Sequence, residues 1–537
     1  MALTKVTGQG IGSIDTEGTI KLDGNYPTGS GNVALGDTAL DDGSLSGANN
    51  TAIGSGALTV NTSGASNVAV GANALDANTT ASNNTAIGFD ALTDNTTGSE
   101  NVAIGMYGLA NNTTATNNFA GGYNALGANT TGASNVGIGH RTLQSNTTGA
   151  ENVAVGAFSL DANTSGSNNV AVGRNALSGN TTAANNTAVG DSALFSNTTG
   201  AGNTAVGEGA LIANTTGASN IGIGDNALAS NTTASANIAI GLNAGDAITT
   251  SPANTLVGHN AGSAISTGSG ENVCVGNNAG ALMTTGQQNI FIGDQASAGA
   301  VVTSPNNVII GDNAGHALAG GGGFNVGVGG AALNLITTGN NNTCVGGFAG
   351  ASTTTGVENT FIGSYAGNNS PVNTTGAYNT LIGRLAKKSS STVNEEVVVG
   401  FNGQGKGAGT AFIVGGNGAF QGNNSTTWSQ TSDRRIKKNI VDNNVGLDAI
   451  NQIQVRNFEY RTADEITELD GSLCGIKKEG TQLGVIAQEI QKVLPDVVAT
   501  ESTGCMTVNP DNLTWHLVNA VKELSAKVAE LEAKLGE

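Results

Sequence analysis

A unit of 17 residues repeats through most of this chain of 537 residues and constrains the fold more than any other feature. A typical copy reads Asn-Thr-Ala-Ile-Gly-x-x-Ala-Leu-x-x-Asn-Thr-Thr-Gly-x-x. Its first glycine, here the alignment glycine, recurs 22 times from Gly36 to Gly400, at intervals of 17 with occasional 18s and one 20. Such self-similarity indicates stacked coils, each burying its apolar face against its neighbours.

A coil of this length is too short for a pair of helices with their turns, and its frequent Gly, Asn and Thr oppose helix formation. The apolar segments, such as 68–70 and 221–223, have the length and the β-branched residues of very short strands. Stacked coils would place these strands in parallel ladders about 4.8 Å apart. The sequence therefore predicts a mainly β protein whose body is a parallel β-solenoid or β-roll, roughly 100 Å long.

The Asn-Thr-Thr-Gly segment is expected to form a turn in which Asn stacks on Asn and the side-chain amides bond from coil to coil. Its Gly is expected to supply a positive φ without strain. Each coil offers only about three or four small apolar side chains. The core of one chain would be thin, so we expect several chains to associate. Cys274 and Cys344 stand where neighbouring repeats have Ala, and we expect both to be small core residues.

The repeat resembles the head domains of trimeric autotransporter adhesins, whose units also carry an Asn-x-x-Ala-Ile-Gly-x-x-Ala pattern, much as in residues 50–54. The resemblance covers about residues 30–400 and implies a trimeric parallel β-roll or β-helix. Those heads usually have shorter repeats, so the cross-section and handedness of the coil stay open.

Charge changes abruptly at Ser432. The first 431 residues contain 8 Lys and Arg and 22 Asp and Glu, whereas the last 106 contain 12 and 17. The acidic excess argues against nucleic acid or an anionic membrane as the principal ligand. No stretch approaches the roughly 20 apolar residues of a bilayer span, and none of signal-peptide length opens the chain. We expect synthesis in a cytoplasm without export or membrane insertion.

The last part of the chain has the pattern of a compact α+β domain. Residues 455–460 alternate as a strand, and 483–490 indicate a strand passing into a helix that stops at Pro495. The C-terminal helix carries apolar residues at heptad spacing. This seam either joins chains or packs on its own domain, and we favour contact between chains because the body also calls for several. The residues of the seam are Leu517, Val521, Leu524, Val528, Leu531 and Leu535.

The order of these motifs is specific. A Ser-Asp-x-Arg-x-Lys segment at 432–437 precedes 484–489 with Pro495, and the heptad helix follows. This set resembles the C-terminal intramolecular chaperone of endosialidases and other phage tail spikes and fibres, a module that also occurs in a few unrelated self-cleaving proteins. The resemblance covers residues 432–537. It implies a domain that trimerises, templates folding of the upstream fibre and then removes itself.

The resemblance also implies the residues of a self-cleaving serine endopeptidase that turns over once. Ser432 would be the nucleophile and Lys437 its base, Thr431–Ser432 the scissile bond, and Asp433 and Arg435 supporting residues. A serine hydroxyl is a weak nucleophile until a base takes its proton, which a neutral lysine can do.

The spacing of this pair restricts its geometry. Residues five apart on an α-helix differ by about 140° in rotation and do not share a face. Either the segment from Ser432 to Lys437 is not α-helical, or Lys437 meets a serine of another chain. The alternative is that residues 434–438 form only a solvated basic patch without a catalytic role.

These observations divide the chain into an N-terminal cap or attachment segment (1–30), a β-solenoid body (31–400), a connector (401–431) and a chaperone and autoprotease domain (432–537) with a C-terminal helix over 513–535. The interpretation is a homotrimeric structural protein of a virion tail, a fibre or spike made in the host cytoplasm. Its N-terminus would join a tail or baseplate protein, and its body would bind a glycan or protein receptor on the host cell.

Two other functions fit parts of the sequence. A bacterial trimeric surface adhesin with the same module is disfavoured by the missing export signal. A polysaccharide-degrading spike is disfavoured by thinly spread carboxylates and an aromatic content of 4%. The four histidines are far apart in sequence, so we expect no metal site and no cofactor.

Overall fold

The computed structural model describes residues 30–368, 375–414, 419–422, 434–462, 465–468, 479–500 and 504–536. The chain forms two compact units, 1–430 and 431–537. In the described ranges, no helix has the length and apolar character that a membrane crossing requires.

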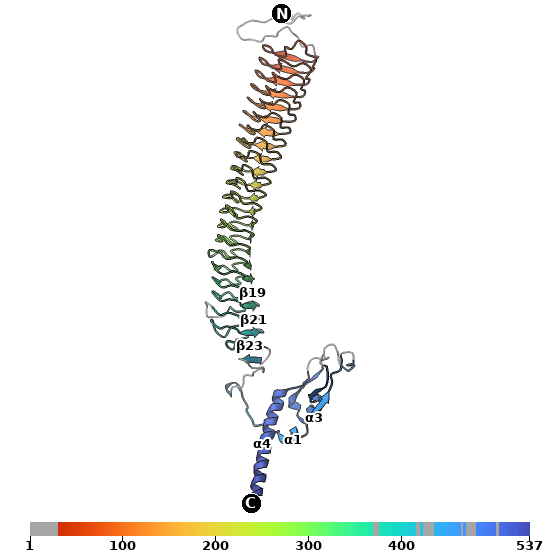
Figure 1. The fold of residues 1–537 in the computed structure, drawn as a ribbon, viewed down its shortest axis with the longest axis vertical. Coiled ribbons are helices and arrows are strands. Elements are labelled where there is room, and N and C mark those ends of the chain that lie inside the picture. Colours follow the sequence, from red (N-terminus) through yellow and green to blue (C-terminus); the bar gives the residue numbers. More distant parts are fainter. Residues whose placement is uncertain are drawn as a thin grey trace, which may run out of the picture. The chain divides into compact units, whose positions relative to one another are not determined.

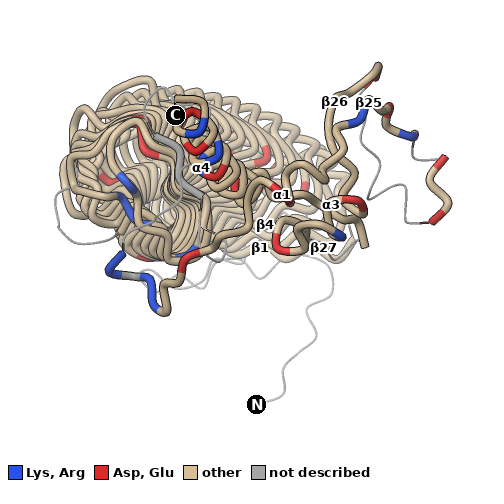
Figure 2. The backbone as a smooth tube through the Cα atoms, turned by 90° about the horizontal axis from the view of Figure 1, so that it is seen from below, with Lys and Arg blue, Asp and Glu red and all other residues tan. Residues whose placement is uncertain are grey.

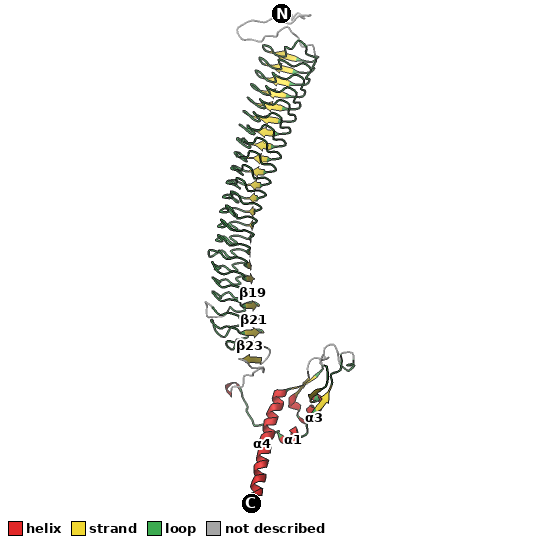
Figure 3. Ribbon diagram, viewed as in Figure 1, coloured by secondary structure: helices red, strands yellow, loops and turns green. Residues whose placement is uncertain are grey.

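The first unit is the expected parallel β-solenoid, with one three-residue strand in each coil (Figure 1). Consecutive strands pair in parallel and in register, as where Thr85, Ala86 and Ile87 lie beside Val102, Ala103 and Ile104. Figure 3 shows these strands stacked in one row, with the rest of each coil formed by turns and loops. Among the described strands of this unit, only the last pair, β23 with β24, is antiparallel. The strands are β1 (Val33–Leu35), β2 (Thr51–Ile53), β3 (Val68–Val70), β4 (Thr85–Ile87), β5 (Val102–Ile104), β6 (Phe119–Gly121), β7 (Val136–Ile138), β8 (Val153–Val155), β9 (Val170–Val172), β10 (Thr187–Val189), β11 (Thr204–Val206), β12 (Ile221–Ile223), β13 (Ile238–Ile240), β14 (Thr255–Val257), β15 (Val273–Val275), β16 (Ile290–Ile292), β17 (Val308–Ile310), β18 (Val326–Val328), β19 (Thr343–Val345), β20 (Thr360–Ile362), β21 (Thr380–Ile382), β22 (Val397–Val399), β23 (Thr410–Ile413) and β24 (Ala419–Gly422).

The alignment glycines explain why the coil repeats so strictly. From Gly36 to Gly400 their φ angles lie between 127° and 142°. A Cβ on Gly88 would lie 2.6 Å from the carbonyl carbon and oxygen of Gly105 in the next coil, so no other residue fits. The expectation for the glycine of the Asn-Thr-Thr-Gly turn was wrong. Gly64, for instance, is not among the residues with positive φ, because this turn needs no left-handed residue at that position.

Two rows of buried asparagines run through the body. In the turn row, Asn78 Nδ2 donates to Asn61 Oδ1 of the preceding coil (2.9 Å) and to the carbonyl oxygen of Ala81 (3.1 Å). This confirms the predicted stacking of the Asn-Thr-Thr-Gly turns. A second row, immediately before the strands, was not predicted. There the backbone nitrogen and Nδ2 of Asn67 both donate to Asn50 Oδ1, at 3.0 and 3.1 Å.

The interior residues of each coil are buried by the same chain, without a second copy. The middle residue of every strand from β2 to β22 is buried. In the first half of the body this residue is small and a buried leucine follows six positions later, as for Ala86 and Leu92. Cys274 and Cys344 are fully buried and free, as expected. The thin interior is therefore not in itself a reason for chains to associate.

The second unit contains η1 (Arg434–Ile436), α1 (Leu447–Ile450), β25 (Arg456–Phe458), β26 (Gln482–Gly484), α3 (Ala487–Val493), η2 (Pro495–Val497), β27 (Val498–Thr500), β28 (Met506–Val508) and α4 (Pro510–Leu535). β25 pairs with β26, and β27 with β28, both antiparallel. A core of Ile490, Leu494 and Val497 joins α3 and η2. The predicted strand at 455–460, the passage from strand to helix before Pro495 and the C-terminal helix are confirmed.

Candidate self-cleavage site and its support

Three of the predicted site residues, Thr431, Ser432 and Asp433, lie outside the described residues. Arg435 and Lys437 are described and exposed. They belong to a single 3-10 turn, in which the backbone nitrogen of Lys437 donates to the carbonyl oxygen of Arg434 (3.2 Å). Since this turn is not an α-helix, the rotation that separates residues five apart on an α-helix does not apply to it. Pairing of Ser432 with Lys437 stays a prediction.

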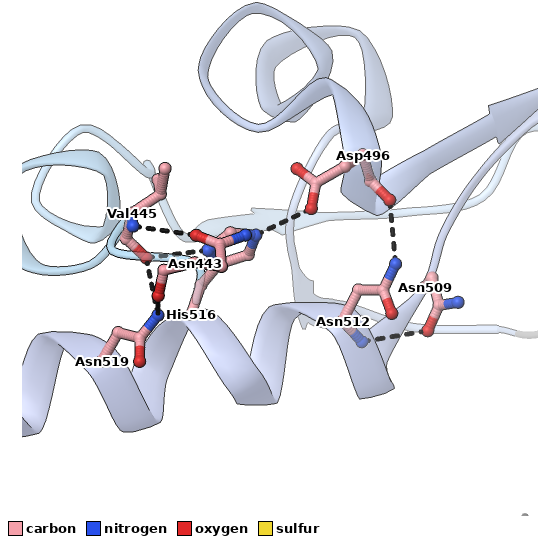
Figure 4. Close-up of polar contacts among 7 residues, drawn as sticks. All are labelled: Asn443, Val445, Asp496, Asn509, Asn512, His516 and Asn519. Carbon is pink, nitrogen blue, oxygen red and sulfur yellow. Dashed lines mark hydrogen bonds and ion pairs between the residues drawn. The ribbon is translucent and has the colours of Figure 1, made fainter. Parts of the chain in front are cut away.

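The chain that follows Lys437 is held on α4 (Figure 4). Asn519 Nδ2 donates to the carbonyl oxygen of Asn443 (2.7 Å), and His516 Nδ1 lies 2.9 Å from the carbonyl oxygen of Val445. One turn further along the helix, Glu523 Oε2 accepts from the backbone nitrogen of Leu447 (3.0 Å). These three helix residues are three and four positions apart and share one face. α4 thus fixes the path of the segment 443–447.

His516 is the most buried polar side chain of this support. Its Nε2 lies 2.9 Å from Asp496 Oδ2, so both ring nitrogens face acceptors. A neutral imidazole can donate only one hydrogen bond, whereas the imidazolium donates two. Burial opposes the charged ring, but the bonds to Val445 and Asp496 and the charge of Asp496 raise the pKa of His516 above its ordinary value. The geometry therefore favours a charged link between α4, η2 and the segment after Lys437.

Sequence reasoning missed this link because it treated the histidines as scattered. The available signal was the spacing of His516, Asn519 and Glu523, which places three polar side chains on one face of the helix. The apolar residues of the heptad lie on a different face of the helix. The partners Val445 and Asp496 are non-local and carried no signal.

The apolar seam of α4 is not used by its own unit. Its six residues are between 44% and 86% exposed, whereas the buried residues of the helix are His516 and Ala520. In the described residues of this unit, the seam therefore does not pack on its own domain. Figure 2 shows that charged residues are few along the coils of the body and frequent on α4.

A second unusual site lies in the last coils of the body. Lys388 is 9% exposed, its Nζ lies 5.8 Å from the ring centroid of Phe361, and it has no hydrogen-bond partner among the described residues. Burial lowers the pKa of Lys388 to about 8, although Glu396 and Cys344 act in the opposite direction. Glu396 is fully buried and accepts from the backbone nitrogens of Ser389 and Gly407, each at 2.8 Å.

Glu396 also ends the asparagine row before the strands, since its backbone nitrogen donates to Asn379 Oδ1 (3.1 Å). Within the described ranges, no three His, Cys, Asp or Glu side chains gather to hold a metal ion.

A comparison with protein families finds a match in the C-terminal unit. Residues 432–499 match the model of the peptidase S74 family, described as the chaperone of endosialidase. The match begins at the proposed nucleophile Ser432 and runs through η1, α3 and η2 into β27, so α4 lies beyond it. It covers a minor part of the chain. The protein therefore carries, behind a β-solenoid body, a C-terminal domain similar to the chaperone of endosialidase.

Proposed function

We propose that this protein is a homotrimeric tail fibre or tail spike of a virion, whose C-terminal domain drives assembly and then cleaves itself off between Thr431 and Ser432. One observation carries the proposal: a domain similar to the chaperone of endosialidase directly follows a long β-solenoid. Nearly all strands of the solenoid have three residues, and each of these pairs in parallel with the strand one coil away. Such a chain folds slowly and benefits from a template.

Two exposed apolar strips support association of several copies. The first is the seam of α4. The second is the outer face of the sheet, where the first and third residues of each strand are Val, Ile or Thr in almost every coil. Third residues such as Ile87, Ile104 and Ile223 are 36–44% exposed. Contiguous exposed apolar surface of this extent is typical of protein interfaces.

The proposed cleavage needs only this chain and water. The hydroxyl oxygen of Ser432 attacks the carbonyl carbon of Thr431 while Lys437 takes the hydroxyl proton. The bond from that carbon to the Ser432 nitrogen breaks, and Lys437 returns the proton to this nitrogen. Water then hydrolyses the resulting ester. Asp433 and Arg435 would position the pair.

In the virion, the N-terminal part would attach to a tail or baseplate protein, and the rigid body would project toward a receptor on the host cell. The rows of asparagines and the parallel sheet give a durable rod that stays after the C-terminal domain has left.

A denaturing gel tests the cleavage. Wild type should separate into two fragments, while Ser432→Ala and Lys437→Ala should remain at 52.8 kDa. Lys438→Ala is the matched control and should cleave, because only Lys437 is the base. A folded wild type that stays at 52.8 kDa would contradict self-cleavage, and a cleaved product that is monomeric by light scattering would contradict trimeric assembly.

A further inference from the structure

Five aromatic rings form a continuous row on five successive coils of the body. Phe89 and Tyr107 have ring centroids 5.7 Å apart, Tyr107 and Tyr123 6.0 Å, Tyr123 and His140 5.3 Å, and His140 and Phe158 5.2 Å. The whole chain has only 12 Phe, 6 Tyr and 2 Trp. A concentration of four of these with a histidine in one row calls for an explanation.

The rings occupy the corner of the coil, the two residues after each alignment glycine. Phe89, Tyr123 and His140 stand at the first corner position, and Tyr107 and Phe158 at the second. Phe89 and Tyr123 are 42% and 40% exposed. In most other coils the corner residues are small or polar, so the fold does not require a ring there.

The backbone makes the second corner position costly for a ring. Tyr107 and Phe158 have φ angles of 60° and 59°. Asn tolerates this left-handed region better than an aromatic residue, and the strain for a non-glycine residue is about 1 kcal/mol or more. Asn stands at this position in nine coils, at Asn73, Asn124, Asn175, Asn226, Asn243, Asn260, Asn278, Asn313 and Asn402. The strained backbone of Tyr107 and Phe158 is not offset by packing of their rings in the buried core, which indicates that these rings have a role outside the coil.

We propose that this aromatic row binds an extended glycan chain lengthwise. Along the row Tyr123 and His140 stack on each other and the other three pairs meet edge to face, and C–H groups of pyranose rings would pack against the ring surface that these contacts leave exposed. The ring centroids are 5.2–6.0 Å apart, so a linear ligand lying along the row would meet one ring after another. Three of the five other corner residues of these coils, Asp90, Asn124 and Arg141, supply hydrogen-bonding groups for sugar hydroxyls, as do the hydroxyls of the two tyrosines.

The size of the row argues for a glycan and against another copy of the chain. Five coils at about 4.8 Å each span only about 20–25 Å. The partly exposed rings fall well short of the roughly 800 Å² per partner of a stable protein interface. The apolar strip of the sheet, by contrast, follows the whole body. A short, narrow row matches a narrow, linear ligand.

The inference rests on the proposed function, because it names the ligand class of the host receptor. The repeat itself supplies substitutions that the coil accepts. A triple variant with Tyr107→Asn, Phe158→Asn and Tyr123→Ser installs residues that other coils carry at the same positions, such as Asn175 and Ser55. The control variant, Phe348→Asn with Tyr365→Asn, removes the stacked pair at the same corner in two distant coils.

Binding of cellohexaose and of chitohexaose to the full chain is measured by isothermal titration calorimetry. Wild type and the control variant should bind at least one hexasaccharide with equal affinity. The triple variant should lose about tenfold or more in affinity. Its thermal midpoint should stay equal or rise, because Asn relieves the strain.

The inference is overturned if wild type binds neither hexasaccharide, or if the triple variant binds as wild type does. It is also overturned if the triple variant has a lower mass by light scattering, since the row would then join copies of the chain. Wild type that cleaves and assembles but binds no hexasaccharide removes this inference alone. Wild type that binds but does not cleave removes only the proposed self-cleavage.

Discussion

At the scale of single residues, the buried amides of the turn row are satisfied by their neighbours along the rod. Between the two ends of the row, each Nδ2 donates to the preceding coil and to its own turn, and each Oδ1 accepts from the next coil. The row ends at Asn231, because Ile248 occupies the following coil. Asn231 Oδ1 consequently has no hydrogen-bond partner among the described residues. A buried amide of this row is therefore fully hydrogen-bonded only where identical residues stack on both sides of it.

Asn146→Asp tests this dependence in the middle of the row. Asn146 Nδ2 donates to Asn129 Oδ1 (2.8 Å) and to the carbonyl oxygen of Gly149 (2.9 Å), and Asn163 Nδ2 donates to Asn146 Oδ1. An aspartate of the same shape cannot donate and buries a charge. We expect a loss of about 3 kcal/mol, seen as a lower midpoint of thermal unfolding by circular dichroism. Asn111→Asp, at an exposed position, is the control and should change little.

Lys388 gives the body a pH dependence of defined sign. Its pKa falls from 10.5 to about 8 on folding, so between these pH values the unfolded chain binds more protons and stability rises with pH. Below about pH 8 the folded protein carries the cost of a buried charge. Lys388→Met should therefore raise the free energy of unfolding at pH 7 by up to about 3 kcal/mol.

That advantage of Lys388→Met over wild type should shrink as the pH rises from about 8 to above 10.5. Lys387→Met, at the half-buried neighbouring lysine, serves as the control. Denaturant titrations at several pH values make the comparison, and a less stable Lys388→Met at pH 7 would show that the cation is favourable where it is.

At the scale of the coil, two designs fill the same interior. Early coils combine a small strand residue with a leucine six positions later. Later coils combine a large strand residue with a glycine, as in Phe361 and Gly367, or Leu256 and Gly262. A Cβ on Gly367 would lie 2.5 Å from the Phe361 ring, so the glycine makes room for the ring. At the same boundary, Ile248 and Ile265 replace the asparagines of the turn row and add apolar volume.

A double-mutant cycle on Phe361 and Gly367 measures how strongly the two positions are coupled. Phe361→Ala should cost about 3–5 kcal/mol by opening a cavity, and Gly367→Leu about 1–3 kcal/mol by overpacking. The double variant restores the combination of Ala86 and Leu92, so it should be more stable than the sum of the single effects predicts. Unfolding free energies from denaturant titration give the coupling, and additive effects would mean that the two side chains do not share space.

At the scale of the whole molecule, the sequence predicts what depends on the period and on local chemistry. The strands, the alignment glycines and the stacked turns all follow from residues one coil apart. The exchange between Phe361 and Gly367 needs knowledge that residues six apart face the same interior. The aromatic row alternates between two corner positions, and His516 meets Asp496 through tertiary packing. Such contacts leave no periodic signal, which is why they became evident only in the folded chain.

Assembly through the seam of α4 is the prediction that concerns the whole molecule. In a Ser432→Ala background, which keeps the C-terminal domain attached, Leu524→Asp with Val528→Asp places charges in the centre of the seam. Buried unpaired charges are costly, so light scattering should show a lower mass than for Ser432→Ala alone. Ala526→Asp, exposed and outside the heptad positions, should leave the mass unchanged.

The same pair of substitutions in the chain with Ser432 should slow cleavage if assembly comes first. An equal mass in all variants, above that of one chain, would place the contact between copies on the sheet of the body rather than on α4. Cleavage at the wild-type rate with a reduced mass would show instead that the Thr431–Ser432 bond is broken within one chain. These outcomes separate the role of the seam from that of Lys437, because neither Leu524→Asp nor Val528→Asp changes the segment 432–437.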